Sequence, residues 1–126
     1  MEYILEDVTE INIVATDEKY FCEYGELEYS LEEKTVIINA LSVYLKRNKI
    51  GTRLVKELES QFKNLNFESV EVPVSPTKEA VLFWKSMGYK ALSDDDKYWA
   101  KKIARGWQEG SWDTPQGVVV MKKQLN

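Results

Sequence analysis

Apolar residues along the first third of the chain follow the two-residue period of β-strands. Residues 11–16 (INIVAT) predict one strand, and residues 20–33 alternate aromatic and polar side chains around Gly25, which predicts one or two more. Residues 34–43 are β-branched and almost continuously apolar, which predicts a central strand buried on both faces. We expect the strands in this part of the chain to be antiparallel.

The period becomes helical after Ile50, where the apolar residues are Leu54, Val55, Leu58 and Phe62. Residues 69–74 (SVEVPV) predict a short strand, and a strand, a helix and a strand in succession imply a parallel pair with a right-handed crossover. Residues 75–88 have proline near their start and glycine at their end, as helices do.

Three further elements are predicted toward the carboxyl end. Residues 89–92 and 118–123 predict strands, and the middle of residues 93–117 predicts a short helix, since Trp99, Ile103 and Trp107 recur every four residues. Residues 1–126 therefore predict a single α/β domain. Its mixed, partly open sheet would have antiparallel amino-terminal strands and a central parallel pair joined by a crossover helix.

The composition excludes several kinds of active site. The chain has no histidine and one cysteine, so histidine-based catalytic triads and the usual histidine or thiolate metal sites are excluded, and no metal is expected. Acid–base chemistry would need carboxyl, phenol, amine or thiol groups, a chain terminus or water. The single cysteine and an amino terminus unlike a signal peptide predict a cytoplasmic protein.

Charge and hydropathy narrow the classes of partner. The net charge is −4, whereas general nucleic-acid binders are more often basic, so a nucleic-acid partner is disfavoured. No apolar run approaches the length that spans a bilayer, so no membrane partner is expected.

A cationic turn, KRNKIGT at residues 46–52, joins the apolar strand to the helix that begins near Ile50. Free N–H groups at a helix start attract anions, and three of the turn's residues are cationic. Gly51 would let the backbone approach a ligand, and Thr52 could cap the helix or donate its hydroxyl to phosphate. The turn lacks the glycines of Walker A and dinucleotide-binding loops, and taken alone it is more typical of an ordinary basic loop.

In its wider context the turn resembles the central motif of the GNAT family of N-acetyltransferases. That motif is a strand, then [Gln/Arg]-x-x-Gly-x-[Gly/Ala], then a helix, and its six positions fall on residues 46–51. Gly51 matches, Lys46 replaces Gln or Arg, and Lys49 replaces the first glycine. The flanking ALSV and GTRLV extend the resemblance, as does a second family pattern that falls on Ala80, Phe83, Trp84, Lys85, Gly88 and Tyr89.

The resemblance implies that acetyl-CoA binds where the two parallel strands splay apart. Its pantetheine arm would follow the edge of the first strand, and its pyrophosphate would contact the backbone amides of the cationic turn. The residues expected to bind acetyl-CoA are Leu41, Ser42, Val43, Lys46, Arg47, Asn48, Lys49, Ile50, Gly51, Thr52, Thr77 and Trp84.

The resemblance also implies direct transfer of the acetyl group to a primary amine, with the Val43 amide stabilising negative charge on the reacting carbonyl oxygen. Trp84 occupies the position of the family's acidic tyrosine, and an indole is not a usable acid. Tyr89 is the substitute acid, and Glu71 is the candidate base, because it faces away from the valines of its strand. Glu26 and Glu28 are weaker candidates. The alternative interpretations are a core aromatic for Tyr89 and a solvated carboxylate for Glu71.

The sequence before residue 34 is shorter than the family's usual pair of amino-terminal acceptor-binding helices. The resemblance therefore implies a short form with an open acceptor site, which suits a protein lysine or amino terminus slightly better than a small amine.

Residues 93–117 carry an aromatic stripe of Trp99, Ile103 and Trp107, and Trp112 follows. We expect the stripe to pack on the core, and a lid over the acceptor or a homodimer contact is the alternative. Asp94–Asp96 predict a solvated turn, and attraction of a cationic acceptor is the alternative.

Three functions compete. The first is an N-acetyltransferase that uses acetyl-CoA and a small or protein amine. The second is a catalytically degenerate GNAT domain that binds acyl-CoA or a protein partner without turnover, which Lys49 and Trp84 favour. The third is an unrelated α/β domain whose basic turn contacts nucleic acid.

Overall fold

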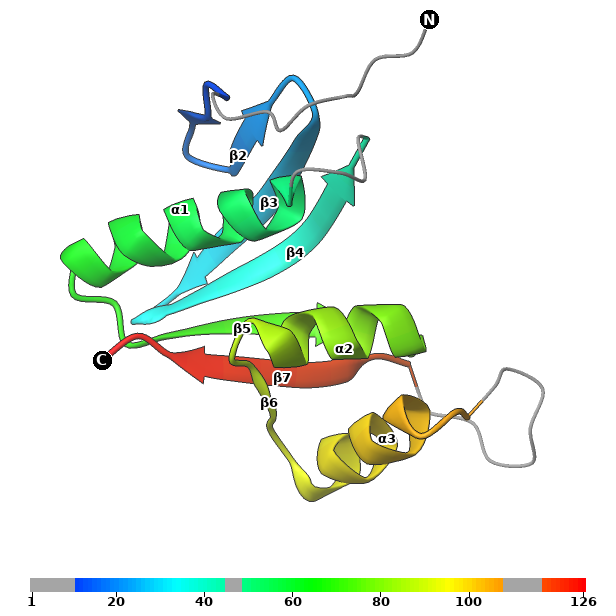
Figure 1. The fold of residues 1–126 in the computed structure, drawn as a ribbon. Coiled ribbons are helices and arrows are strands. Elements are labelled where there is room, and N and C mark those ends of the chain that lie inside the picture. The colour runs from blue at the N-terminus through cyan, green and yellow to red at the C-terminus, as the bar shows by residue number, and fades with distance from the viewer. Residues whose placement is uncertain (1–10, 45–48, 108–116) are drawn as a thin grey trace, which may run out of the picture.

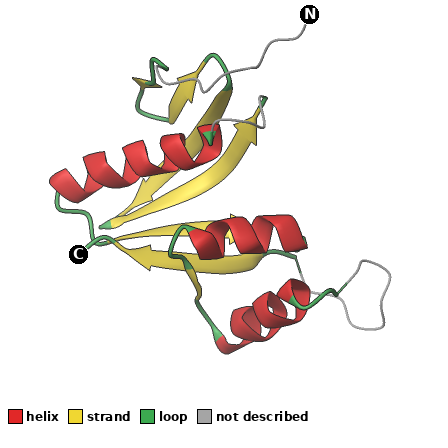
Figure 2. Cartoon of the chain, viewed as in Figure 1, coloured by secondary structure: helices red, strands yellow, loops and turns green. Residues whose placement is uncertain are grey.

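The structure is a computed structural model, and it describes residues 11–44, 49–107 and 117–126. These residues form one seven-stranded sheet and three helices (Figures 1 and 2). The elements, in chain order, are β1 (Val14–Ala15), β2 (Lys19–Cys22), β3 (Gly25–Glu32), β4 (Thr35–Val43), α1 (Ile50–Asn64), β5 (Ser69–Val74), α2 (Lys78–Ser86), β6 (Lys90–Ala91), α3 (Asp94–Ala104) and β7 (Val119–Gln124).

The strand order across the sheet is β1-β2-β3-β4-β5-β7-β6. The β4–β5 pair is parallel, and every other neighbouring pair is antiparallel. This topology confirms the predicted mixed α/β sheet with a central parallel pair. No described helix is long and apolar enough to cross a membrane.

The helices α1 and α2 lie on the same face of the sheet. Each makes a crossover, from β4 to β5 and from β5 to β6, and both crossovers move across the sheet in one direction. Right-handed connections in one direction place their helices on one face. The contacts agree, because α1 packs on β2, β3 and β4, α2 packs on β5, and α3 packs on α2, β6 and β7 (Figure 1).

The core lies between this helical layer and the sheet. Leu54, Val55 and Leu58 of α1 are fully buried, as the helical period predicted. An aromatic row extends this core, with ring centroids 5.5 Å apart for Tyr20 and Tyr29 and 5.3 Å apart for Tyr29 and Phe62. Apolar burial on this scale is the main force that holds α1 on the sheet.

The prediction that residues 34–43 are buried on both faces was wrong. Val36 and Ile38 are buried, whereas Asn39, Ala40 and Ser42 are exposed. In the described part of the chain no helix covers the second face, which we call the open face. The apolar run therefore reflects one buried face and, as described below, one wall of a cleft.

Three other predicted elements can be compared with their observed limits. The helix expected at residues 75–88 begins after Thr77, whose hydroxyl accepts the N–H of Ala80 at 3.2 Å. The strand expected at residues 11–16 is limited to two residues at the sheet edge. The strand expected at 69–74 has those limits.

The aspartates 94–96 form the first turn of α3, so the predicted turn is helical. Asp94 and Asp95 are exposed, as expected of a solvated turn. Ser93 and Asp96 form a reciprocal capping box, and Asp96 also accepts the backbone N–H of Val120 from β7 at 3.0 Å. Trp99 and Ile103 are buried and the Trp107 ring lies 5.9 Å from that of Trp99, so the stripe packs on the core as predicted. Trp112 lies outside the described residues.

Candidate functional site

The parallel strands β4 and β5 separate soon after they begin. Their ladder joins Thr35 to Ser69, Val36 to Val70 and Ile37 to Glu71, and it ends there. Beyond this point β4 continues to Val43 paired with β3, and β5 continues to Val74 paired with β7. The sheet is thus split between its two halves from Ile38 onward.

A β-bulge in β4 lies at the start of the split. Glu28 of β3 pairs with Ala40, and the next residue, Tyr29, pairs with Ile38, so Asn39 is an extra residue without a partner on β3. Leu41 lies opposite the buried Leu27, so the core-facing positions change from even to odd numbers at the bulge. The bulge bends β4 and turns it away from β5.

A cleft of about 750 Å³ fills the split. Strand residues line its walls, and the start of α1 and one side of α2 line the rest. The lining residues are Ile38, Asn39, Ala40, Leu41, Val43, Lys49, Ile50, Gly51, Thr52, Val72, Pro73, Val74, Ser75, Glu79, Ala80, Phe83 and Trp84.

The β5-facing side of β4, which we call the open edge, presents backbone groups to this cleft. The N–H of Tyr44 donates to Tyr24 O at 2.7 Å on the β3 side. Successive residues of a strand point their N–H and C=O groups to opposite edges, so those of Val43 and Leu41 point to the open edge. No described strand pairs with this edge, and buried backbone groups need a hydrogen-bonding partner. A linear ligand that carries amides can supply it, as an added strand does.

The amino-terminal end of α1 forms one end of the cleft. Its N-cap residue, Lys49, makes no side-chain cap, and its first turn contains no acidic residue. By contrast, α2 and α3 are capped by side chains and have acidic residues in their first turns. The backbone N–H groups of Ile50, Gly51 and Thr52 are therefore available to hydrogen-bond an anion. The helix dipole also attracts an anion to this end.

Two backbone features shape this end. Lys49 has a left-handed conformation (φ 54°, ψ 43°), which residues with a Cβ adopt at a cost. Gly51 is helical, and a Cβ there would meet Val43 Cγ2 at 3.4 Å and Leu41 Cδ2 at 3.5 Å. A side chain at position 51 would thus point into the cleft, and one methyl group would fit at ordinary contact distances.

The structure brings together most of the residues that the sequence nominated for ligand binding. Leu41, Val43, Lys49, Ile50, Gly51, Thr52 and Trp84 line the cleft. Ser42 and Thr77 are outside its lining, since Ser42 is exposed beyond the bulge and Thr77 caps α2. Lys46, Arg47 and Asn48 lie outside the described residues. Thr52 lies in the first turn of α1 and does not cap it.

Sequence reasoning missed much of the second wall. Val72, Pro73, Val74 and Ser75 follow from the parallel pairing of β5, and Ala80 and Phe83 follow from the helical period of α2. The predicted strand–helix–strand order was the available signal for this wall. Asn39 and Ala40 line the cleft because of the β-bulge, and the apolar sequence of residues 34–43 does not indicate a bulge.

Tyr89 lies behind the cleft and joins the two halves of the molecule. Its hydroxyl donates to Glu59 of α1 at 2.7 Å, and Glu59 also accepts from Lys123 of β7 at 3.0 Å. Burial, together with the Glu59 carboxylate, raises the pKa of Tyr89 well above its usual value. Trp84 stands between Tyr89 and the cleft, and its ring lies edge-on to Tyr89 with centroids 5.0 Å apart.

The open face carries the carboxylates that sequence reasoning considered. Glu71 lies in the last β4–β5 pair, at the vertex of the split, outside the cleft lining. Glu28 pairs with Ala40, which lines the cleft. Neither carboxylate makes a hydrogen bond or ion pair with a described residue.

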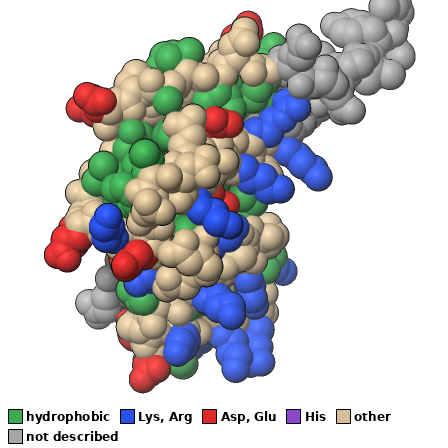
Figure 3. Space-filling view, turned by 90° about the vertical axis from the view of Figure 1, so that its left-hand side faces the viewer, with side chains coloured by type: hydrophobic (Ala, Val, Ile, Leu, Met, Phe, Trp, Pro, Cys, Tyr) green, Lys and Arg blue, Asp and Glu red, His purple; other side chains and the backbone are tan. Residues whose placement is uncertain are grey.

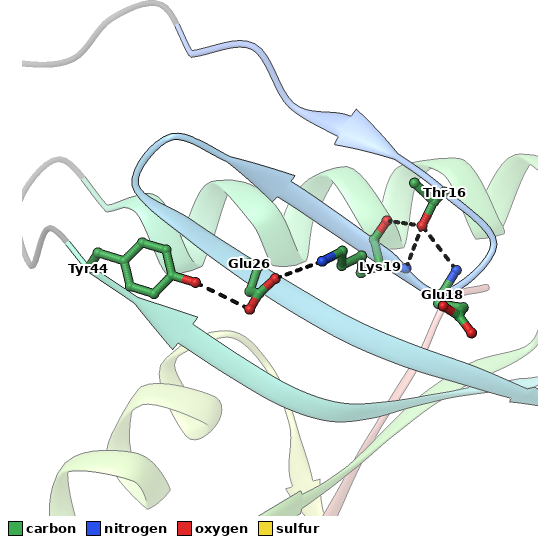
Figure 4. A network of polar contacts seen from close by, with 5 residues as sticks. All are labelled: Thr16, Glu18, Lys19, Glu26 and Tyr44. Carbon is green, nitrogen blue, oxygen red and sulfur yellow. Dashed lines mark hydrogen bonds and ion pairs between the residues drawn. The ribbon is translucent and has the colours of Figure 1, made fainter.

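Glu26 differs, because it accepts from Lys19 at 3.1 Å and from the Tyr44 hydroxyl at 3.2 Å (Figure 4). The hydrogen bond and charge of Lys19 lower the pKa of Glu26 below its usual value. Its carboxylate thus has two hydrogen-bonded partners. Glu28 and Glu71 make no such bond with a described residue, and each lies opposite a lysine on the neighbouring strand, Lys19 and Lys122 respectively.

The family model of the acetyltransferase (GNAT) domain matches residues 4–101. The chain belongs to the GNAT family. In this fold the cleft between β4 and β5 combines an open strand edge with the uncapped start of a helix. The interpretation as an unrelated α/β domain is therefore wrong.

Solved structures share this GNAT fold at low sequence identity. The PaiA N-acetyltransferase of Thermoplasma acidophilum, solved in complex with coenzyme A, has a TM-score of 0.60 and 17% identity over 84% of this chain and 58% of its own. An IAA acetyltransferase of Bacillus cereus has a TM-score of 0.62 and 16% identity, over 84% of this chain and 76% of its own. The ribosomal-protein-S18-alanine N-acetyltransferase of Escherichia coli has a TM-score of 0.60 and 10% identity, over 85% of this chain and 66% of its own.

These similarities establish the fold. The GNAT domain spans less than two thirds of the length of several such relatives, as with 58% of PaiA. It matches none of the curated proteins with which it was compared.

Proposed function

We propose that this GNAT domain transfers an acetyl group from acetyl-CoA to a primary amine. One observation carries the proposal, namely that the open edge of β4 and the uncapped start of α1 line the same cleft. Acetyl-CoA has amides in its pantetheine arm and a pyrophosphate beyond it, so its chemistry matches the two features in order. When bound it supplies an acetyl thioester.

The backbone of β4 and the start of α1 would hold this co-substrate. The N–H and C=O groups of Leu41 and Val43 would pair with the pantetheine amides, and the apolar side chains of Ile38 and Phe83 would exclude water. The amides of residues 50–52 would bind the pyrophosphate, with Lys49 adding positive charge.

The acceptor would approach from the open face. A primary amine is mostly an ammonium ion at neutral pH, so the site must first bind a cation. The ammonium ion must then lose a proton, after which its nitrogen bonds to the acetyl carbon and the carbon–sulfur bond breaks. Glu71 is the proposed base, and Glu28 the proposed ammonium-binding carboxylate. Both lie beside the split and neither has a hydrogen-bonded or ion-paired partner among the described residues. This arrangement fits a cationic acceptor, such as a lysine side chain, an amino terminus or a polyamine.

Binding of acyl-CoA without turnover is the second candidate, and the placement of the aromatic residues favours it. Trp84 stands at the family's acid position, and the Tyr89 hydroxyl is turned to Glu59 behind it. In that case neither Trp84 nor Tyr89 would protonate the leaving group. Turnover would require the CoA thiolate to leave unprotonated or to take a proton from water.

Calorimetry with acetyl-CoA, followed by a thiol-release assay over lysine peptides, peptide amino termini and spermidine, separates the two candidates. Glu71→Gln should lower kcat/KM by roughly 100-fold while the acetyl-CoA affinity stays within about 2-fold. Glu28→Gln should chiefly raise the KM for the amine. The matched control is Glu68→Gln, an exposed carboxylate before β5, which should change neither.

The outcomes are distinct. Binding of acetyl-CoA without release of thiol on any amine would support the second candidate. Absence of acetyl-CoA binding would reject both.

A further inference from the structure

A second cleft, of about 350 Å³, lies between the end of α2, β6 and α3. Four lysines line it and define what we call the lysine cleft: Lys85, Lys90, Lys97 and Lys101. The lysine cleft shares no lining residue with the β4–β5 cleft. Figure 3 shows many Lys and Arg side chains on the lower half of the face that it views, with some Asp and Glu side chains among them and further Lys and Arg side chains above.

The four ammonium groups are not ion-paired within the described structure. None of them makes a hydrogen bond or ion pair with a described residue, and no carboxylate lines the cleft. Lys19 and Lys123, by contrast, are paired with Glu26 and Glu59. This local excess stands out in a chain whose net charge is −4.

The spacing of these lysines concentrates positive charge at the cleft. Lys97 and Lys101 are four residues apart on α3, a spacing at which like charges repel. Lys85 and Lys90 bring two more positive charges to the same cleft from other elements. An anionic partner would remove this repulsion, so the cleft is suited to bind one.

The backbone and side chains of the cleft favour carboxylates over phosphates or nucleic acid. The N–H groups of Gly88 and Tyr89 are bonded within the turn that ends α2, so they offer no amide cradle for phosphate. The lining contains no arginine, and the Tyr89 ring is 1% exposed, which leaves no surface on which a base can stack. Ala91 and Ala100, which are partly exposed, add apolar surface to the lining.

We propose that the lysine cleft docks an acidic segment of a partner protein, with an apolar side chain of that segment seated between the lysines. Charge complementarity selects the partner, and the apolar contact selects carboxylate-rich peptide over a simple polyanion. The docked segment would leave the β4–β5 cleft open, because the two clefts share no lining residue. This proposal stands whether or not the domain turns over acetyl-CoA.

The test is fluorescence anisotropy with a labelled twelve-residue peptide of glutamate, aspartate and leucine, at two salt concentrations. Its competitors are polyglutamate of equal charge, inorganic pyrophosphate and a single-stranded RNA of equal charge. The variants are Lys97→Gln/Lys101→Gln and, on the other elements, Lys85→Gln/Lys90→Gln. The matched control is Lys56→Gln/Lys63→Gln, two exposed lysines of α1 that line neither cleft.

We expect the full chain to bind the peptide, less tightly at higher salt, with each lysine-cleft pair weakening it by at least about 10-fold and the control by less than about 2-fold. Polyglutamate should compete more weakly than the peptide that contains leucine. The proposal is overturned by absence of peptide binding, by equal weakening in the control, or by tighter binding of RNA or pyrophosphate than of peptide. Two separate lysine pairs keep the test decisive if one variant does not fold.

Discussion

Lys49 has the left-handed backbone conformation at the position where the GNAT motif has its first glycine. A residue with a Cβ loses roughly 1–2 kcal/mol in this conformation, because the Cβ approaches the following carbonyl oxygen. The family's glycine is thus explained by the backbone of the turn. In this chain the lysine keeps the same backbone and adds a positive charge beside the amides of α1.

Lys49→Gly should therefore raise the free energy of unfolding by about 0.5–1 kcal/mol, the removed strain less the extra freedom of glycine in the unfolded chain. The matched control is Lys56→Gly in the middle of α1, where glycine should lower the free energy of unfolding by about 1 kcal/mol. Chemical denaturation measures both. If Lys49→Gly and Lys56→Gly lowered the free energy of unfolding by similar amounts, position 49 would not be strained.

Tyr20 and Tyr89 are buried phenols whose pKa values are raised. Burial raises the pKa of Tyr20 to about 12, and burial with the Glu59 carboxylate raises that of Tyr89 further. Between pH 10 and 12 the unfolded chain loses these protons while the folded chain keeps them, so stability should fall as pH rises through this range. Their contribution should be fully present below pH 10.

Denaturation curves at pH 8, 10, 11 and 12 test this expectation. Tyr20→Phe should make the fall in stability between pH 10 and 12 shallower, since one of the linked protons is removed. An unchanged slope in this variant would mean that the Tyr20 phenol titrates alike in both states.

At the scale of the elements, the three helices differ in how they begin. A side chain caps α2 and α3, whereas the start of α1 is free and lies in the cleft. Two threonines, Thr77 and Thr52, allow a comparison, because Thr77 caps α2 and Thr52 lines the cleft without capping.

Thr77→Ala should lower the free energy of unfolding by about 1 kcal/mol and leave acetyl-CoA affinity within about 2-fold. Thr52→Ala should do the reverse, with little change in stability and a weaker affinity by about 3- to 10-fold, the value of one hydrogen bond. Thermal denaturation and calorimetry on both variants are sufficient. Equal effects of the two substitutions on affinity would argue against a ligand at the start of α1.

Elements with a strong internal period were predictable from the sequence. The strand at 69–74 and the helix from Ile50 depend on alternating valines and on the α1 stripe, which are local signals. The double burial of residues 34–43 was not predictable, because exposure depends on what covers the second face. The exposure of Asp94 and Asp95 was predictable, whereas their helical conformation was not, since three acidic residues suit both an irregular solvated turn and a capped first helical turn.

The candidate site was only partly predictable for the same reason. The start of α1 follows from a sequence motif, so Lys49, Ile50 and Gly51 could be named. The extra residue Asn39 and the end of the β4–β5 ladder arise from strand register, which distant parts of the chain set together. Glu28 acquires its place beside the cleft only through that register.

At the scale of the whole molecule, the sheet consists of two halves joined at a vertex. Three residue pairs connect β4 to β5, and Glu59 adds a link from α1 to Tyr89 and Lys123 of the other half. The side chain of Glu59 is 12% exposed, so little water competes with these bonds. The halves are thus held at a fixed separation, which keeps the cleft between them formed.

The central claim is that this cleft, from the open edge of β4 to the start of α1, binds acetyl-CoA. Its most direct test is a titration of the isotopically labelled chain with acetyl-CoA, followed by backbone amide NMR. Gly51→Ala is the matched control for Gly51→Asp, because a methyl group fits at position 51 whereas a carboxylate would put negative charge where the pyrophosphate binds.

The prediction is that amide shifts concentrate at residues 38–43, 49–53, 72–75 and 79–84. They should persist in Gly51→Ala and be lost in Gly51→Asp, with affinity at least about 100-fold weaker. Absence of shifts, shifts centred on the lysine cleft, or undiminished binding by Gly51→Asp would contradict the claim.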